Sequence, residues 1–78
     1  MKLKEYIREL NKLVIEYPEA YELPVIYSED DEGNAYHNVI YSPAMFQVED
    51  PTQYYLEVVG KLGDDNIARE DCNVICIN

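Results

Sequence analysis

The stretch from Leu23 to Tyr41, LPVIYSEDDEGNAYHNVIY, constrains the fold more than any other part of the chain. Two runs rich in β-branched and aromatic residues flank a short acidic block that ends in Gly33-Asn34. Side chains of the first kind favour strands, whereas Gly and Asn favour turns. The pattern therefore predicts a β-hairpin with strands over about residues 24–28 and 36–41 and a turn over 29–34.

The segment before the hairpin predicts one amphipathic helix over about residues 2–17. Its apolar residues recur at helical spacing along one stripe: Leu3, Ile7, Leu10, Val14 and Tyr17. Pro18 cannot continue a helix and disfavours helical geometry at Tyr17, so we expect the helix to end there. An apolar stripe on one side predicts that the helix packs on one face of a sheet.

Further strands are predicted after the hairpin, over about residues 53–59 and 73–77. Residues 44–48 (AMFQV) fit either a strand that continues the hairpin or a short irregular segment. A helix followed by three or four short strands indicates the α+β class. We therefore expect a single domain over 1–78, with an N-terminal helix packed on a small antiparallel sheet of three or four strands.

The length of the chain limits what it can do. A domain of 78 residues buries only roughly 60% of the surface that its unfolded chain exposes. A deep, enclosed active site would take residues that such a core needs. The sequence therefore argues against a self-contained enzyme, and we expect no catalytic residue and no cofactor.

The charge is strongly negative and unevenly placed, with six Lys and Arg against sixteen Asp and Glu. Residues 1–12 hold four bases and two acids, for a charge of +2, and the rest holds two bases and fourteen acids, for −12. Nucleic acids and anionic membranes are polyanions, so direct binding to either is disfavoured. The expected partner is a protein with a basic surface.

The sequence also predicts where the chain resides. It contains no apolar run long enough to span a membrane and no pattern of a secretory signal. We therefore expect a cytoplasmic protein.

The acidic block invites comparison with a calcium-binding loop. If Gly33 took the sixth place of an EF-hand loop, Val39 would take the twelfth, where a bidentate Glu is needed. The block therefore predicts a solvated loop tip, and no metal site is expected.

The remaining reactive side chains form no recognisable catalytic or metal motif. Cys72 and Cys76 on one strand would lie roughly 13 Å apart, too far for a disulfide, so we expect buried thiols acting as small hydrophobes. The single histidine, His37, is expected on the second strand of the hairpin without a nucleophile motif beside it.

The eight tyrosines offer one route to a small ligand. On a strand, Tyr54 and Tyr55 would place one ring on each face, and such rings can stack on a base. This leaves open an oligomeric protein that sequesters a small molecule or nucleotide, against the plainer interpretation of tyrosines on a sheet face.

Carboxylates gather at the expected loop tips, over residues 29–32, 49–50, 64–65 and 70–71. They could imitate the charge of a phosphate backbone, or they could simply keep a small protein soluble. Met45 and Phe46 are expected either in the core or as apolar anchors for a partner or a second copy. The residues predicted to contact a partner are Glu29, Asp30, Asp31, Glu32, Glu49, Asp50, Met45 and Phe46.

Lys4-Glu5-Tyr6-Ile7 opens the predicted helix, and Asp30 to Tyr36 (DDEGNAY) form the predicted turn. This layout resembles a loose group of small uncharacterised proteins of tailed bacteriophages and prophages. In those proteins a KELIEKL-type helix precedes a strand, a D-D-E-G-N-x-Y turn and a return strand. The resemblance covers about half of the chain and implies a phage accessory protein without a transferable catalytic motif.

Together these observations predict a non-catalytic protein that binds a host protein through its acidic surface. Inhibition of a nucleic-acid-handling or defence enzyme is the most concrete form of this prediction. The alternatives are the small-molecule-sequestering oligomer and a small enzyme with a pocket around His37.

Overall fold

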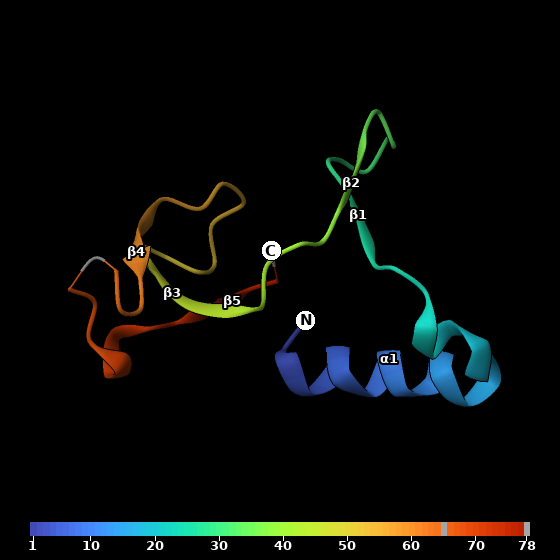
Figure 1. Ribbon diagram of the computed structural model, residues 1–78. Helices are drawn as coiled ribbons and strands as arrows, with labels where there is room; N and C mark the ends of the chain where they lie inside the picture. Colours follow the sequence, from blue (N-terminus) through green and yellow to red (C-terminus); the bar gives the residue numbers. More distant parts are fainter. Residues whose placement is uncertain (65, 78) are drawn as a thin grey trace. The chain divides into compact units, whose positions relative to one another are not determined.

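The structure is a computed structural model that describes residues 1–64 and 66–77. These residues form one α-helix, two short 3₁₀ helices and five strands (Figure 1). The strands belong to antiparallel sheets of two and three strands, so the predicted α+β class is confirmed, although we expected a single sheet. The chain divides into two compact units, Met1–Val39 and Ile40–Asn78, and we describe each by itself.

The first unit begins with helix α1 (Leu3–Glu16), which lies within the predicted range. Its last helical hydrogen bond runs from the Tyr17 N–H to the Leu13 carbonyl, at 2.8 Å. Pro18 then starts the 3₁₀ helix η1 (Pro18–Glu22), which packs against α1. Proline at the first position of a helix costs no hydrogen bond, which explains why one helix ends and the other begins here.

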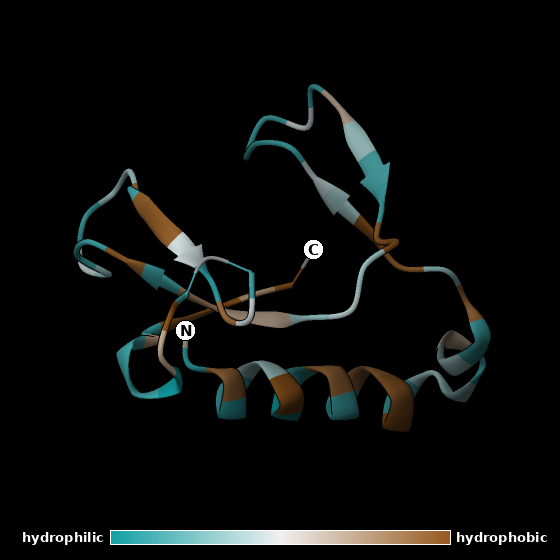
Figure 2. Ribbon diagram, turned by 60° about the vertical axis from the view of Figure 1, so that its left-hand side comes forward, coloured by the Kyte–Doolittle hydropathy of each residue, from teal (hydrophilic) through white to brown (hydrophobic). Residues whose placement is uncertain are grey.

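Apolar and polar residues alternate along α1, as Figure 2 shows. Four members of the apolar stripe are each about half exposed: Leu3, Ile7, Leu10 and Tyr17. No residue within Leu3–Glu16 is fully buried. The packing of this stripe on a sheet face stays a prediction. In the part of the chain that the structure describes, we find no helix with the length and hydropathy that a bilayer crossing requires.

The hairpin of the first unit pairs β1 (Ile26–Ser28) with β2 (Tyr36–Asn38). The strands are antiparallel, with Tyr27 opposite His37. A further bond from the Val39 N–H to the Val25 carbonyl extends the pairing by one step. Both strands lie inside the predicted ranges and are shorter than them.

The second unit is a three-stranded sheet in the order β4-β3-β5. Its central strand is β3 (Ala44–Val48), the segment for which the sequence left two structures open. The outer strands are β4 (Val58–Lys61) and β5 (Val74–Cys76), and the 3₁₀ helix η2 (Arg69–Asp71) precedes β5. Both outer strands run antiparallel to β3.

The β3–β4 connection differs from the predicted strand over 53–59. Residues 51–55 form turns and bends, and β4 begins only at Val58. The Glu49 N–H donates to the Glu57 carbonyl at 2.9 Å, which closes residues 49–57 into a loop. We call this segment the aromatic loop, because it carries Tyr54 and Tyr55.

The most deeply buried hydrophobic residue described in the second unit is Val48, at the end of β3. Among residues 1–64 and 66–77, it is the one buried hydrophobic residue, with 2% exposure. The register of β3 against β4 shifts between Gln47 and Val48. On the other side, the Asn73 side chain pairs with Val48 through two hydrogen bonds. Asn73 Oδ1 accepts from the Val48 N–H at 2.9 Å, and Asn73 Nδ2 donates to the Val48 carbonyl at 3.0 Å.

This amide therefore takes the place of a backbone partner. The Asn73 N–H also donates to the Phe46 carbonyl at 3.0 Å. Asn73 therefore provides hydrogen-bond partners for the backbone of both Phe46 and Val48. A buried backbone group without a partner costs free energy, and Asn73 prevents that cost at Val48.

We expect Asn73→Ala to destabilise the protein by about 1–3 kcal/mol, because it leaves the Val48 N–H and carbonyl without their partner. Urea denaturation followed by circular dichroism measures the loss. Asn38→Ala, at the exposed end of β2, is the control and should change stability by less than about 0.5 kcal/mol. Equal effects of the two substitutions would contradict the role of the Asn73 amide.

Candidate functional site

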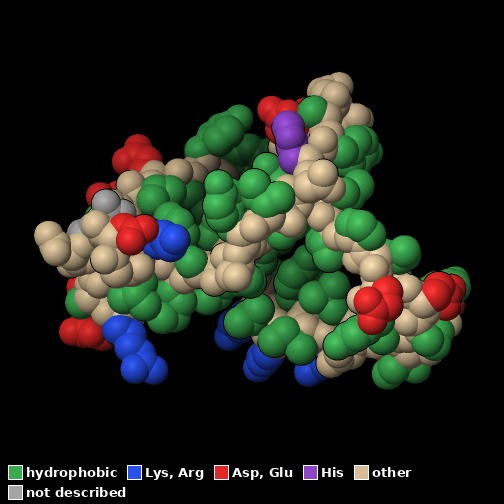
Figure 3. All heavy atoms as spheres, viewed as in Figure 1, with side chains coloured by type: hydrophobic (Ala, Val, Ile, Leu, Met, Phe, Trp, Pro, Cys, Tyr) green, Lys and Arg blue, Asp and Glu red, His purple; other side chains and the backbone are tan. Residues whose placement is uncertain are grey.

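The acidic side chains lie at the surface, and Figure 3 shows several separate acidic patches on the face that it displays. The predicted partner-binding residues fall into two groups, Glu29 to Glu32 in the first unit and the other four in the second. Glu29, Asp31, Glu32 and Glu49 are exposed, whereas Met45 and Phe46 are half-buried. Asp65, one of the loop-tip acids, lies outside the described residues.

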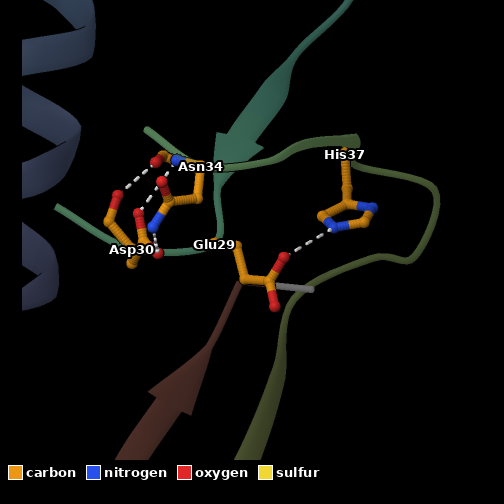
Figure 4. Close-up of polar contacts among 5 residues, drawn as sticks. Glu29, Asp30, Asn34 and His37 are labelled. Carbon is orange, nitrogen blue, oxygen red and sulfur yellow. Dashed lines mark hydrogen bonds and ion pairs between the residues drawn. The ribbon is translucent and has the colours of Figure 1, made fainter. Parts of the chain in front are cut away.

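Asp30 is exposed, and its carboxylate accepts hydrogen bonds from within the acidic loop, residues 29–34 (Figure 4). Its Oδ1 accepts hydrogen bonds from the N–H groups of Glu32 and Asn34, both at 3.1 Å. Its Oδ2 accepts from Asn34 Nδ2 at 2.8 Å, and the Ser28 hydroxyl donates to its carbonyl. The Asn34 N–H and side chain hold the pKa of Asp30 below its ordinary value of 3.8, because they stabilise the ionised form.

Gly33 gives this loop its shape; of the two residues from which the sequence predicts a positive φ, Gly33 or Asn34, it is Gly33 that has one. Its φ of 71° lies in the left-handed region that favours glycine. A Cβ atom there would also lie 2.6 Å from the hydroxyl oxygen of Tyr36. The loop therefore depends on glycine for both its backbone angle and its space.

Glu29 points away from Asp30 and toward His37 (Figure 4). Glu29 Oε2 and His37 Nε2 are 3.4 Å apart, and the His37 ring lies 5.4 Å from the ring of Tyr27. The Glu29 and His37 side chains are 62% and 51% exposed, so water screens the pair and its net contribution is small. Among the described residues, no three His, Cys, Asp or Glu side chains gather in a way that could hold a metal.

Asp50 accepts hydrogen bonds within the aromatic loop, as Asp30 does within the acidic loop. Its Oδ1 accepts from the hydroxyl and the N–H of Thr52, at 2.6 and 2.9 Å, and its Oδ2 accepts from Gln53 Nε2 at 3.2 Å. These bonds, that of the Thr52 hydroxyl first, lower the pKa of Asp50. Two of the predicted partner-binding carboxylates are thus used inside their own loops.

Tyr54 and Tyr55 do not lie on opposite faces of a strand, as the sequence suggested. Their rings contact each other edge to face, with centroids 4.8 Å apart and an angle of 86° between the ring planes. Both are almost fully exposed, at 87% and 84%. The predicted alternation failed because these residues lie in a loop that Asp50 folds. The sequence Glu49-Asp50-Pro51-Thr52 predicts a turn, but the turns and bends of the structure continue through Tyr55, which places both tyrosines in the loop.

Met45 and Phe46 occupy the central strand of the sheet, so neither is a freely protruding anchor. Met45 lies opposite Ile75, and Phe46 lies opposite both Val74 and Lys61. Each is half-buried, which places them closer to the core than to an exposed interface.

A small open pocket of about 210 Å³ lies on the Phe46 side of this sheet. Its lining is Tyr41, Ser42, Ala44, Phe46, Lys61 and Cys76. Two aromatic rings and the Lys61 ammonium on one surface could take a flat group that carries negative charge. Lys61 also lies 3.7 Å from a carboxylate oxygen of Asp64. This pocket could not be identified from the sequence, because Lys61 and Phe46 meet only through the β3–β4 register.

The two cysteines are both half-buried, which fits small hydrophobic side chains. The Cys72 thiol lies 3.7 Å from the Ala68 carbonyl, and Cys76 lies on β5 against the pocket.

Comparison of the chain with protein families, curated proteins and solved structures finds no match.

The Asp30 carboxylate should titrate with a midpoint below 3.8. Because its folded pKa is lowered, its contribution to loop order is present above that value and is lost as pH falls through the folded pKa. The amide resonances of Glu32 and Asn34, followed by NMR during acid titration, measure this transition.

Asn34→Ala removes the side-chain donor but keeps the backbone donor, so it should raise the midpoint part of the way. Asp31→Asn is the control and should leave both amide resonances in place. A midpoint at or above 3.8 in the unsubstituted protein would contradict the part assigned to Asp30.

Proposed function

We propose that this chain is a non-catalytic, phage-type accessory protein that binds the basic surface of a host protein. In its most concrete form it inhibits a nucleic-acid-handling or defence enzyme in the host cytoplasm, by presenting carboxylates where that enzyme expects phosphates. The resemblance of residues 30–36 to phage proteins supports a phage origin, and the charge distribution supports binding to a basic surface.

One observation carries this proposal: the acidic side chains that protrude from two loops are not neutralised by the chain itself. Asp31, Glu32 and Glu49 are exposed, and within residues 1–64 and 66–77 no Lys or Arg forms an ion pair with them. Charges of one sign on a surface raise the rate of encounter with an oppositely charged surface. They also repel nucleic acid, so the proposed partner is the enzyme that handles the nucleic acid.

Neutralising the exposed carboxylates should weaken capture of a basic partner by roughly tenfold, since each screened ion pair contributes modestly. The variant is Asp31→Asn, Glu32→Gln and Glu49→Gln, which spares Asp30 and Asp50. The immobilised protein is incubated with bacterial lysate, and bound proteins are identified by mass spectrometry. Capture should fall as salt rises from about 0.01 M to about 1 M, where the screening length shortens from roughly 30 Å to roughly 3 Å.

A matched control tests whether capture depends on the position of the removed charges or only on the net charge. Glu16→Gln, Glu19→Gln and Glu22→Gln remove the same number of exposed charges from α1 and η1 and should leave capture unchanged. Recovery of no basic protein at the lowest salt, or an equal loss in both variants, would contradict the proposal.

The pocket beside Phe46 favours a second candidate function, binding of a small anionic aromatic molecule such as a nucleotide. At about 210 Å³ it falls below the usual size of a drug-sized pocket, so it would hold a base-sized group rather than a whole nucleotide. Tyr41 and Phe46 supply aromatic surface, and Lys61 supplies positive charge.

If this second function holds, calorimetry should detect binding of adenosine monophosphate, and Lys61→Gln should weaken it by roughly fivefold or more. Arg69→Gln, on η2, removes a positive charge outside the pocket lining and should leave binding unchanged. Absence of binding in the unsubstituted protein would rule out this ligand.

A further inference from the structure

The aromatic loop exposes two tyrosine rings to solvent. Tyr54 and Tyr55 are 87% and 84% exposed, although burial of an aromatic ring stabilises a folded protein or a complex. Leu56 and Val58, which follow them, are exposed as well. Tyrosine is one of the residue types enriched among those that carry most of the binding energy of protein interfaces.

Hydrogen bonds close and order the loop that carries these rings. Asp50 binds Thr52 and Gln53, and the bond from the Glu49 N–H to the Glu57 carbonyl closes the base of the loop. The two rings also pack against each other edge to face. An ordered binding element loses less conformational entropy on association than a floppy one.

The charge of the loop indicates the chemistry of its partner. Residues 49–57 contain Glu49, Asp50 and Glu57 and no Lys, Arg or His. Because Asp50 is occupied by the loop, Glu49 and Glu57 supply the available charge. A loop that carries both tyrosine rings and carboxylates suits a guanidinium group, which can stack on a ring and pair with an acid. A lysine ammonium offers charge without the planar surface.

We propose that the aromatic loop is the docking surface for an arginine-bearing segment of a basic protein. This inference rests on the proposed function and names the element and the side-chain chemistry that would carry it. A second copy of the chain is disfavoured as the occupant, because each copy has a net charge of −10 and would bring like-charged loops together.

Oligo-arginine and oligo-lysine peptides of equal length test the inference by calorimetry at low salt. The unsubstituted protein should bind oligo-arginine more tightly. Tyr54→Ala with Tyr55→Ala should weaken oligo-arginine binding by roughly 5- to 30-fold and abolish the preference, since it removes two ring faces. Tyr54→Phe with Tyr55→Phe keeps the rings and should keep the preference.

Tyr21→Ala is the matched control, because Tyr21 is also an exposed tyrosine, at 76%, but lies on η1. It should leave binding of both peptides unchanged. Glu49→Gln with Glu57→Gln should weaken binding of both peptides, because it removes charge and leaves the rings. Far-UV circular dichroism checks that each variant keeps the fold of the parent.

The outcomes separate this inference from the proposed function. If both peptides bind equally and the double alanine variant matches the parent, the inference is overturned while the acidic surface keeps its role. If neither peptide binds at low salt, both are overturned. If sedimentation shows a dimer that the double alanine variant loses, the loop joins two copies and the inference is overturned.

Discussion

The pairing of the Asn73 amide with the backbone of Val48 is the interaction on which the order of the second unit depends. Val48 is the one buried hydrophobic residue in the described ranges 1–64 and 66–77, so apolar packing supplies only part of that order. A side chain that both donates and accepts can replace a strand residue, and here it secures the end of the central strand. The same kind of contact, a polar side chain hydrogen-bonded to backbone, recurs in the acidic loop and in the aromatic loop.

That recurrence divides the acidic residues into two classes. Asp30 and Asp50 accept hydrogen bonds from their own loops, and the resulting fall in pKa keeps them ionised for that task. Asp31, Glu32 and Glu49 remain exposed and form no ion pair with a Lys or Arg of the described residues. Composition counts both classes as negative charge, although only the second is available to a partner without loosening the loop that presents it.

The features that could be predicted from the sequence are those set by neighbours in the chain. Pro18 ends α1, and Gly33 supplies the left-handed residue of the hairpin turn. The start of β4 was misplaced because apolar alternation over residues 54–58 imitates a strand, while a local carboxylate bond decides the fold. Asn73 could not be identified because its partner lies 25 residues away. The edge-to-face contact of the tyrosines likewise depends on the extent of the loop, which continues past the turn predicted at residues 49–52.

Charge and aromatic surface contribute differently to recognition, and the aromatic loop carries both. Long-range attraction increases the rate of encounter with any basic protein and is weakened by salt. It discriminates poorly, because many proteins have basic surfaces. The exposed rings act only at contact, where a planar cation gains more from them than a compact one. The acidic surface would therefore bring partners to the protein, and Tyr54 and Tyr55 would determine which of them remain bound.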